Sequence, residues 1–377
     1  MTVLPDGVTE VVLSGAPFRL SSGEMLPEVR VAVKTWGHPT GDNAILVCHA
    51  LTGDADAASW WPGVVGPGRA LDPERHFIIG MNILGGCRGT TGPLSLDPRT
   101  GRAYGLSFPD ITVQDIVAVE AAALKEMGVG RLRLIAGGSL GGMQALAWAL
   151  LHPASVDHVL VAAAPWASPP LAIAWNAIGR QAILHDPDFL GGARPGPGRA
   201  PRGLAIARML AMTTYRSHEN FHLKFSREQT GGDDPVARRL GPYATEIAKS
   251  SRFAPRFAAE TYLHYQGEKL VRRFDAFTYL YLTQAMDLFD AGLLVPKGSA
   301  GPDLPSVMCL SVSSDILYPP VEVARIGQEL ERLGYPVWTE EIRSPHGHDA
   351  FLIEGDAVGR AIGRLLATRS ALGSKVS

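Results

Sequence analysis

The stretch Leu132-Arg-Leu-Ile-Ala-Gly-Gly-Ser139-Leu-Gly-Gly-Met-Gln-Ala145 decides how the rest of the chain is interpreted. An apolar, strand-like run leads into a glycine-rich turn that holds Ser139 in the pattern G-x-S-x-G, and a helical pattern follows. Glycines suit this turn because larger side chains would collide where the chain reverses so sharply. The turn would raise the Ser139 hydroxyl above the end of a sheet and beside a helix N-terminus, which favours developing negative charge.

A simpler interpretation is a strand-to-helix turn in which Ser139 only caps the helix, since the short pattern often occurs by chance. The strand before Ser139 and the helix after it favour a nucleophile. Both are features of the nucleophile turn in the α/β-hydrolase fold.

A serine nucleophile needs a base, and the base needs a carboxylate that orients it. In the α/β-hydrolase fold the chain order is serine, acid and histidine, with the last two in loops after late strands. Asp315 follows an apolar strand that ends at Val312, and the strand that ends at Ile342 leads to His346 and His348. In isolation Asp315 would be a helix-start residue, but its place after a late strand favours the acid. Spacing does not choose between the two histidines.

The oxyanion formed in such chemistry needs two backbone N–H donors. One comes from the residue after the nucleophile, which is Leu140. The other comes from a loop after an earlier strand, here the segment 49–53, in which Leu51 is the candidate donor. The alternative for this segment is an ordinary turn at the end of a strand.

Strand-like and helical patterns alternate in two parts of the chain, which predicts a mainly parallel sheet covered on both faces. The expected strands are 44–48, 77–80, 131–136, 156–163, 306–312 and 337–342, and the expected helices are 112–127, 143–151, 320–333 and 356–367. Between them the chain is helical without a convincing strand, with the clearest helices at 172–184, 203–213 and 274–289 and a Gly/Pro/Arg-rich loop at 191–202. We therefore expect an α/β-hydrolase core formed by residues 1–165 and 299–377, interrupted by a helical lid insertion at 166–298.

Composition indicates a globular protein and argues against nucleic acid or a membrane as its partner. Of the 377 residues, 46% are hydrophobic and 19% charged, which is enough for a large buried core. The net charge of −2 leaves no basic excess for nucleic acid or an anionic membrane. No apolar run approaches the roughly 18 residues of a membrane span, and the N-terminal stretch lacks a secretory pattern. Cys48, Cys87 and Cys309 suggest no disulfide framework, so the cytoplasm is expected.

Further motifs occur in order from residue 49 to residue 352, across both the core and the insertion. They are His49-Ala-Leu-Thr-Gly53 with Trp60-Trp61, Asn82-Ile-Leu-Gly-Gly-Cys-Arg-Gly-Thr-Thr-Gly-Pro93, Gly137-Gly-Ser-Leu-Gly-Gly-Met-Gln144, Arg180-Gln-Ala-Ile183 with Asp186-Pro187, Gly203-Leu-Ala-Ile-Ala-Arg208, Thr214-Tyr-Arg-Ser217, Glu260-Thr-Tyr-Leu with Gln266, Arg273-Phe-Asp-Ala276, Ser314-Asp-Ile-Leu-Tyr-Pro-Pro320 and Gly347-His-Asp-Ala-Phe-Leu352. Together these segments resemble the homoserine O-acetyltransferases and their close relatives.

The resemblance implies roles that spacing alone does not assign. The family's catalytic histidine belongs to the Gly-His-Asp-Ala-Phe-Leu segment, which implies His348 and leaves His346 as a loop residue. Asp349 matches a position that contacts the amino-acid substrate. Arg216 matches the position that holds the substrate carboxylate, a role that suits a planar, bidentate guanidinium. The alternative for Arg216 is a surface arginine on a helix.

Two departures from the family's pattern fall in the insertion and concern which amino acid is bound. Phe277 stands where relatives usually carry a small polar residue, often asparagine. The tyrosine that accompanies the substrate-binding arginine has no clear counterpart, and Phe221 and His222 lie nearby instead.

The resemblance implies transfer of an acetyl group from acetyl-CoA to homoserine through an acyl-Ser139 intermediate, in methionine biosynthesis. Acetyl-CoA would be a co-substrate, with no metal or bound cofactor, and a homodimer through the lid helices is implied. Alternatives are a succinyl donor, a serine acceptor or a plain esterase. A non-catalytic binding protein of the same fold is disfavoured, because all three catalytic candidates are present.

Overall fold

The computed structural model describes residues 2–3, 7–14, 17–189, 202–229, 255–296 and 303–368. The predicted loop at 191–202 lies outside these residues, except for Arg202. Within the described ranges, no helix is both long enough and apolar enough to cross a bilayer.

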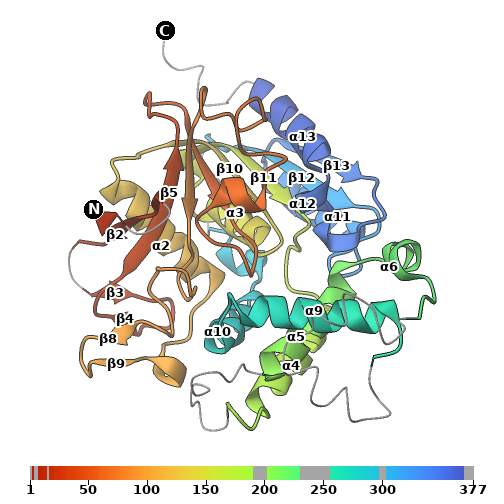
Figure 1. Cartoon of the computed structure of the whole chain (residues 1–377). Coiled ribbons are helices and arrows are strands. Elements are labelled where there is room, and N and C mark those ends of the chain that lie inside the picture. The colour runs from red at the N-terminus through yellow and green to blue at the C-terminus, as the bar shows by residue number, and fades with distance from the viewer. Residues whose placement is uncertain are drawn as a thin grey trace.

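A nine-stranded sheet forms the centre of the molecule (Figure 1). Its strands, in spatial order, are β1 (Thr2–Val3), β2 (Thr9–Val12), β5 (Arg30–Trp36), β7 (Phe77–Met81), β6 (Ala44–Cys48), β10 (Leu132–Gly138), β11 (Val156–Ala162), β12 (Ser306–Val312) and β13 (Val337–Ile342). From β7 to β13 every neighbouring pair is parallel, whereas β1, β2 and β5 pair antiparallel. The predicted mainly parallel sheet is therefore confirmed, and an antiparallel edge is added to it.

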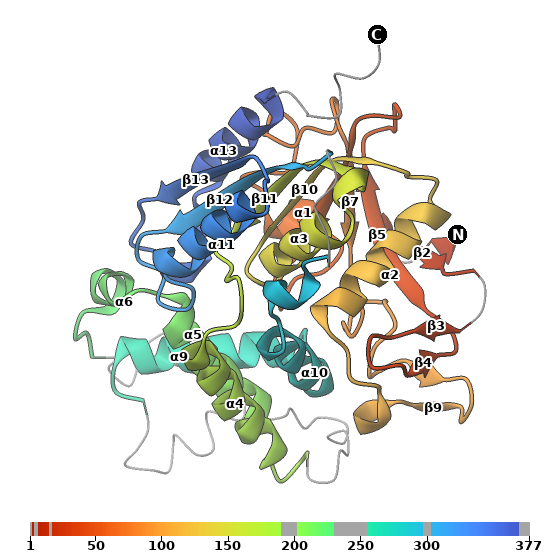
Figure 2. The same ribbon diagram turned by 180° about the vertical axis from the view of Figure 1, so that it is seen from behind.

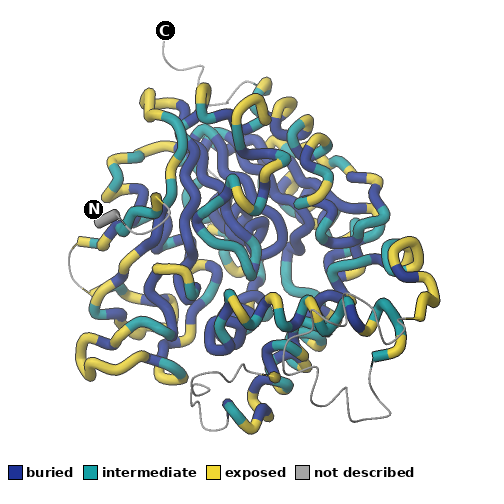
Figure 3. The backbone as a smooth tube through the Cα atoms, in the orientation of Figure 1, coloured by how far each residue is buried: buried dark blue, intermediate teal, exposed yellow. Residues whose placement is uncertain are grey.

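Helices cover both faces of this sheet (Figures 1 and 2). The first face carries α2 (Val113–Glu126), α3 (Leu140–Leu151) and α11 (Pro320–Arg332), and the second carries α1 (Ala57–Trp60), α12 (Ala350–Ile353) and α13 (Gly355–Ala367). Each face of the sheet has its own apolar core, and successive side chains of β6 alternate between them. Leu46 and Cys48 belong to the core on the first face, and Ile45 and Val47 belong to the core on the second. The central strands β6, β7, β10, β11 and β12 are accordingly buried along almost their whole length (Figure 3).

Small elements complete the core. Among the described residues, two short antiparallel pairs lie outside the main sheet, and single-turn 3₁₀ helices occur in the connections of the core. They are β3 (Phe18–Arg19) with β4 (Met25–Leu26), β8 (Leu96–Asp97) with β9 (Arg102–Ala103), η2 (Gly105–Ser107), η3 (Pro153–Ser155) and η6 (Gly347–Asp349).

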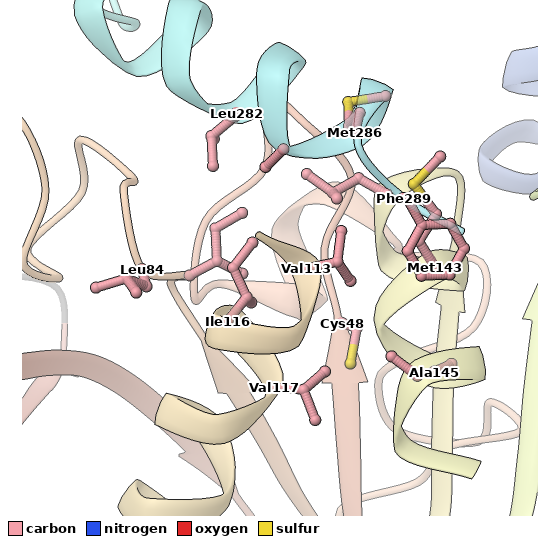
Figure 4. Close-up of a cluster of buried hydrophobic side chains, with 14 of the residues drawn as sticks. Cys48, Leu84, Val113, Ile116, Val117, Met143, Ala145, Leu282, Met286 and Phe289 are labelled. Carbon is pink, nitrogen blue, oxygen red and sulfur yellow. The ribbon is translucent and has the colours of Figure 1, made fainter. Parts of the chain in front are cut away.

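The chain between β11 and β12 forms helices at one end of the sheet (Figure 1). They are α4 (Pro170–Leu184), α5 (Arg202–Tyr215), α6 (His218–Phe225), α9 (Ala258–Val271), α10 (Ala276–Asp287) and the short η5 (Ala291–Leu294). Figure 4 shows a cluster of buried apolar side chains that joins the two parts. Leu282 and Met286 come from α10, and Val113 and Met143 come from α2 and α3 of the core. Apolar packing thus attaches these helices to the core.

Glu120 is a buried acid between α2 and α3. Its side chain is 2% exposed, and its Oε2 accepts a hydrogen bond from Trp148 Nε1 at 2.9 Å. Burial raises the pKa of Glu120 to about 7, and the Trp148 hydrogen bond opposes this only in part. The folded chain therefore holds this proton between about pH 4.5 and pH 7, where the unfolded chain releases it.

Replacing Glu120 with glutamine should stabilise the fold at neutral and alkaline pH but not in acid. The pKa of Glu120 is higher in the folded than in the unfolded chain, so wild-type stability falls as the pH rises from about 4.5 to about 7. The gain in the free energy of unfolding should grow from near zero below about pH 4.5 to roughly 3 kcal/mol above pH 7. Denaturant unfolding at several pH values measures it, with exposed Glu74→Gln as the matched control. A gain that does not depend on pH would contradict the prediction.

Candidate active site

Ser139 occupies a strained turn between β10 and α3. Its φ is 58° and its ψ is −124°, and its N–H donates to the Ala162 carbonyl at 3.0 Å. The glycines around it allow this close approach. A Cβ on Gly137 would lie 2.3 Å from the Gly141 carbonyl oxygen, and a Cβ on Gly141 would lie 2.2 Å from that of Cys48. The sequence G-x-S-x-G is therefore required by the geometry of the turn.

Asp315 and His348 form a buried pair in the loops after β12 and β13. His348 Nδ1 lies 2.7 Å from Asp315 Oδ2, and the two residues are 2% and 3% exposed. The second oxygen, Oδ1, accepts hydrogen bonds from the backbone N–H groups of Leu317 at 2.8 Å and Tyr318 at 3.0 Å. These two bonds fix the carboxylate and orient the imidazole with Nδ1 toward it.

The electrostatic surroundings of His348 suit a proton acceptor. Burial disfavours its charged form, but the charge and hydrogen bond of Asp315, together with the charge of Asp349, outweigh burial and raise the pKa of His348. Its Nε2 is buried and has no hydrogen-bond partner among the described residues. The ring packs between Tyr215, Tyr318 and Phe351, with centroids 5.4 to 5.7 Å away.

Ser139 and His348 line the same pocket, which has a volume of about 450 Å³. Leu51 lines it too, in the turn that follows β6. Among the described residues, neither Leu51 nor Leu140 donates its backbone N–H to a protein acceptor. Leu51 is 5% exposed and Leu140 is fully buried. Two buried N–H groups without acceptors beside a serine are the arrangement that an oxyanion hole needs.

Arg216 is found in an ion pair with Asp349, with Nη2 3.1 Å from Oδ2. Asp349 lines the pocket, but Arg216 is not among its lining residues. Arg208 does line the pocket, and its guanidinium carbon lies 5.3 Å from the centroid of the Tyr215 ring. Of the two arginines, Arg208 lines the pocket directly, and Arg216 is joined to it through its ion pair with Asp349.

Sequence reasoning missed the pairing of Arg208 with Tyr215, although both lay in quoted motifs. The two residues are seven positions apart in α5, which is two helical turns, so they share one face of the helix. Tyr215 also contacts the His348 ring. Tyr215 therefore lies at the pocket between Arg208 and His348.

Three more basic side chains line the pocket: Arg88, Lys269 of α9 and Arg273. Arg273 donates from Nη1 to the Thr52 carbonyl at 2.6 Å. Burial, followed by the charges of Arg208 and Arg88, lowers the pKa of Arg273, because these cations lie close together. Such a pocket attracts anionic ligands.

The remaining residues that the sequence singled out lie away from the pocket wall. Phe277 is buried against Phe189, with ring centroids 4.9 Å apart, so its bulk fills core space. His222 is on the exposed side of α6. His346 is partly exposed, and its Nδ1 lies 2.9 Å from Asn220 Nδ2.

The fold and this site together define the class of protein. A sequence model of the family described as the alpha/beta hydrolase fold matches residues 43–354. Among solved structures, homoserine O-acetyltransferase from Bacillus anthracis superposes with a TM-score of 0.82 at 22% identity over 96% of this chain and 98% of that one. Esterase E22 gives 0.81 at 24% identity over 95% and 100%. These likenesses establish the fold.

Sequence relatives are more specific than the structural neighbours. The homoserine O-acetyltransferase of Symbiobacterium thermophilum is 43% identical over 366 residues, covering 93% of this chain and 92% of that protein. The enzyme of that name from Methanosphaerula palustris is 42% identical over 371 residues, covering 95% and 73%. The chain belongs to the homoserine O-acetyltransferase family, as its motifs predicted.

Proposed function

We propose that this chain transfers the acetyl group of acetyl-CoA to the hydroxyl of L-homoserine, through an acetyl-Ser139 intermediate, in the synthesis of methionine. The observation that carries the proposal is that Ser139, Leu51 and His348, which pairs with Asp315, line one cationic pocket. Among the described residues, the backbone N–H groups of Leu51 and of Leu140, the residue after Ser139, have no acceptor. Membership of the family supports the choice of donor and acceptor.

In the first half-reaction, His348 Nε2 takes the Ser139 proton as Oγ attacks the thioester carbonyl. The carbonyl oxygen becomes an oxyanion that accepts hydrogen bonds from the N–H groups of Leu51 and Leu140. When the C–S bond breaks, His348 returns the proton to the leaving sulfur, and CoA departs. Asp315 stabilises the imidazolium that exists between the two proton transfers.

In the second half-reaction, the homoserine hydroxyl attacks the acetyl carbonyl while His348 takes its proton. The bond to Ser139 Oγ breaks, and the serine recovers its proton from His348, which gives O-acetylhomoserine. These steps balance without a metal or redox cofactor.

We propose that the helices of residues 166–298 act as a lid over this chemistry. Arg208 and Tyr215 of α5 and Lys269 of α9 reach the pocket from that segment. A covered site limits water, which would otherwise hydrolyse the acetyl-serine. The basic residues of the pocket would hold the phosphate groups of CoA and the carboxylate of the amino acid.

The test is a panel of acceptors and donors with purified protein. Thiol release from acetyl-CoA or succinyl-CoA is followed with homoserine, serine or water alone as acceptor. We expect acetyl-CoA with homoserine to be fastest. Release that is equally fast with water alone would indicate an esterase and contradict the proposal, and preference for succinyl-CoA or serine would correct the substrate.

Replacing Arg208 with glutamine should raise the KM for homoserine about 10- to 100-fold, as expected for loss of a charged hydrogen bond worth roughly 1.5–3 kcal/mol. The rate of CoA release in the first turnover with acetyl-CoA should change by a smaller factor than the KM for homoserine does. Arg216→Gln is the matched comparison, because Arg216 pairs with Asp349 and does not line the pocket. A rise in KM caused by Arg216→Gln but not by Arg208→Gln would reverse the assignment.

Two further parts of the proposal concern assembly and location. The lid helices would form a homodimer, and the exposed Leu171 and Ile178 of α4 support this, each being 57% exposed. Light scattering should give the mass of a dimer, and a monomer would contradict it.

Cytoplasmic location agrees with the three cysteines, all of which are free.

A further inference from the structure

Gln144 is a fully buried amide at the start of the second turn of α3, five residues after Ser139. Its Nε2 donates to the carbonyl oxygen of His49 at 3.2 Å and to that of Leu140 at 3.1 Å. Backbone carbonyl oxygens only accept hydrogen bonds, so these two contacts fix which end of the amide carries the NH₂ group. The other end, Oε1, is buried without a hydrogen-bond partner among the described residues.

The two carbonyl groups belong to the two segments that hold the oxyanion donors. Leu140 itself provides one donor, and His49 lies two residues before Leu51, which provides the other. A single NH₂ group thus ties the loop after β6 to the start of α3. No other side chain among the described residues makes this connection by a hydrogen bond.

The side chain of His49 holds the same loop from its other side. Its Nδ1 lies 2.7 Å from the Ala50 carbonyl oxygen, and its Nε2 lies 3.3 Å from the Ile83 backbone nitrogen. Since the carbonyl can only accept and the N–H can only donate, Nδ1 carries the proton and Nε2 is the acceptor. Burial lowers the pKa of His49, which keeps this neutral form. The loop is therefore anchored to the core at His49, packs against the backbone of α3 at Gly141, and is tied to α3 by the hydrogen bond from Gln144.

The unpartnered Oε1 argues that stability is not the reason for an amide here. A buried acceptor without a donor destabilises a fold by about 1–3 kcal/mol. Methionine has a similar volume and would bury no such group. The feature that only the amide supplies is the N–H donor shared by the two carbonyl groups.

We propose that Gln144 is a positioning residue that sets the distance between the Leu51 and Leu140 N–H groups and so tunes the oxyanion hole. The proposal rests on the oxyanion hole in the proposed function. A displacement of either donor weakens hydrogen bonds that form fully only in the transition state, so the chemical steps should be affected and substrate binding should not.

Gln144→Met tests this, because it removes the donor and keeps the volume. We expect kcat to fall about 30- to 100-fold, somewhat less than the roughly 10²–10³-fold loss when an oxyanion donor is removed altogether. The KM for acetyl-CoA should stay within about threefold, and the denaturant midpoint should be unchanged or higher. Gln284→Met in α10 is the matched control, since Gln284 only bonds Asp110 at the surface.

The rate of Ser139 labelling by a fluorophosphonate provides a readout that does not depend on the acceptor. Ser139 Oγ attacks phosphorus, the P–F bond breaks, fluoride leaves and the serine proton passes to His348, while the phosphoryl oxygen faces the Leu51 and Leu140 N–H groups. Labelling of Gln144→Met should slow in parallel with kcat. If wild-type protein is labelled but does not acetylate homoserine, the proposed function fails while the role of Gln144 is still tested.

Gln144→Glu covers the case in which the methionine variant does not fold. Its size is that of glutamine, and only a protonated carboxyl can donate to one of the two carbonyl groups. The labelling rate relative to wild type should therefore recover as the pH falls. Labelling of Gln144→Met within threefold of wild type, a defect confined to KM, or a Gln144→Glu defect that does not vary with pH would overturn the proposal.

Discussion

Replacing Ser139 with alanine should reduce CoA release from acetyl-CoA and homoserine by about 10⁴-fold or more, because the acyl acceptor of the first half-reaction is lost. Alanine keeps the Cβ that already tolerates a φ of 58°, and Ser139 accepts no capping bond with its side chain. The variant should therefore fold as the wild type does. Thiol release measures turnover, and mass spectrometry of the Ser139 peptide after incubation with acetyl-CoA shows whether an acetyl adduct forms.

Ser22→Ala is the matched control, since Ser22 lies exposed in a turn and does not line the pocket. It should keep wild-type turnover. The wild-type protein should carry acetyl on Ser139 when homoserine is absent, and the Ser139→Ala variant should carry none on this peptide. Turnover by Ser139→Ala close to the wild-type rate would show that another group carries the acyl chain and would exclude the mechanism.

The sequence predicted those helices and strands that are determined by neighbouring residues, such as apolar runs and helix caps. The apolar run at 306–312 became β12 with the same bounds, because a strand buried on both faces is uniformly apolar. The helix predicted at 112–127 became α2, with Thr112 and Asp115 as a capping box and Gly128 just beyond its end at a φ of 75°. Predicting α3 from Met143 placed its start three residues late, since Gly141 and Gly142 hide the helix within a glycine-rich run.

Long-range packing decided what the sequence did not predict. Strand β5 was not foreseen, because its assignment depends on antiparallel pairing with β2 and β7 at the edge of the sheet. In the site, the order of Ser139, Asp315 and His348 followed from chain topology, whereas which of Arg208 and Arg216 lines the pocket depends on how α5 is rotated against the core. Both arginines lie within one helix-and-turn segment, and the periodicity of α5 alone does not say which of its faces meets the pocket.

Replacing Asp315 with asparagine should lower kcat by about 10³- to 10⁴-fold with little change in the fold. The backbone N–H groups of Leu317 and Tyr318 can only donate, so they would hold the amide oxygen and turn the NH₂ group toward His348. His348 Nδ1 would then have to accept, which places the ring proton on Nε2. An imidazole in that tautomer cannot take the Ser139 proton.

The pH dependence separates this cause from a loss of structure. Burial lowers the wild-type pKa of His348, but Asp315 and Asp349 together outweigh it and raise the pKa, so kcat/KM should fall below a pKa that lies above 6.5. Without the Asp315 charge burial dominates, and the residual activity of Asp315→Asn should lose its acidic limb at lower pH than wild type. Asp157→Asn, at a surface pair with Arg131, controls for the substitution itself. An unmoved acidic limb, or a loss below tenfold, would show that Asp315 does not control the protonation of His348, since its charge is the largest influence that favours the imidazolium.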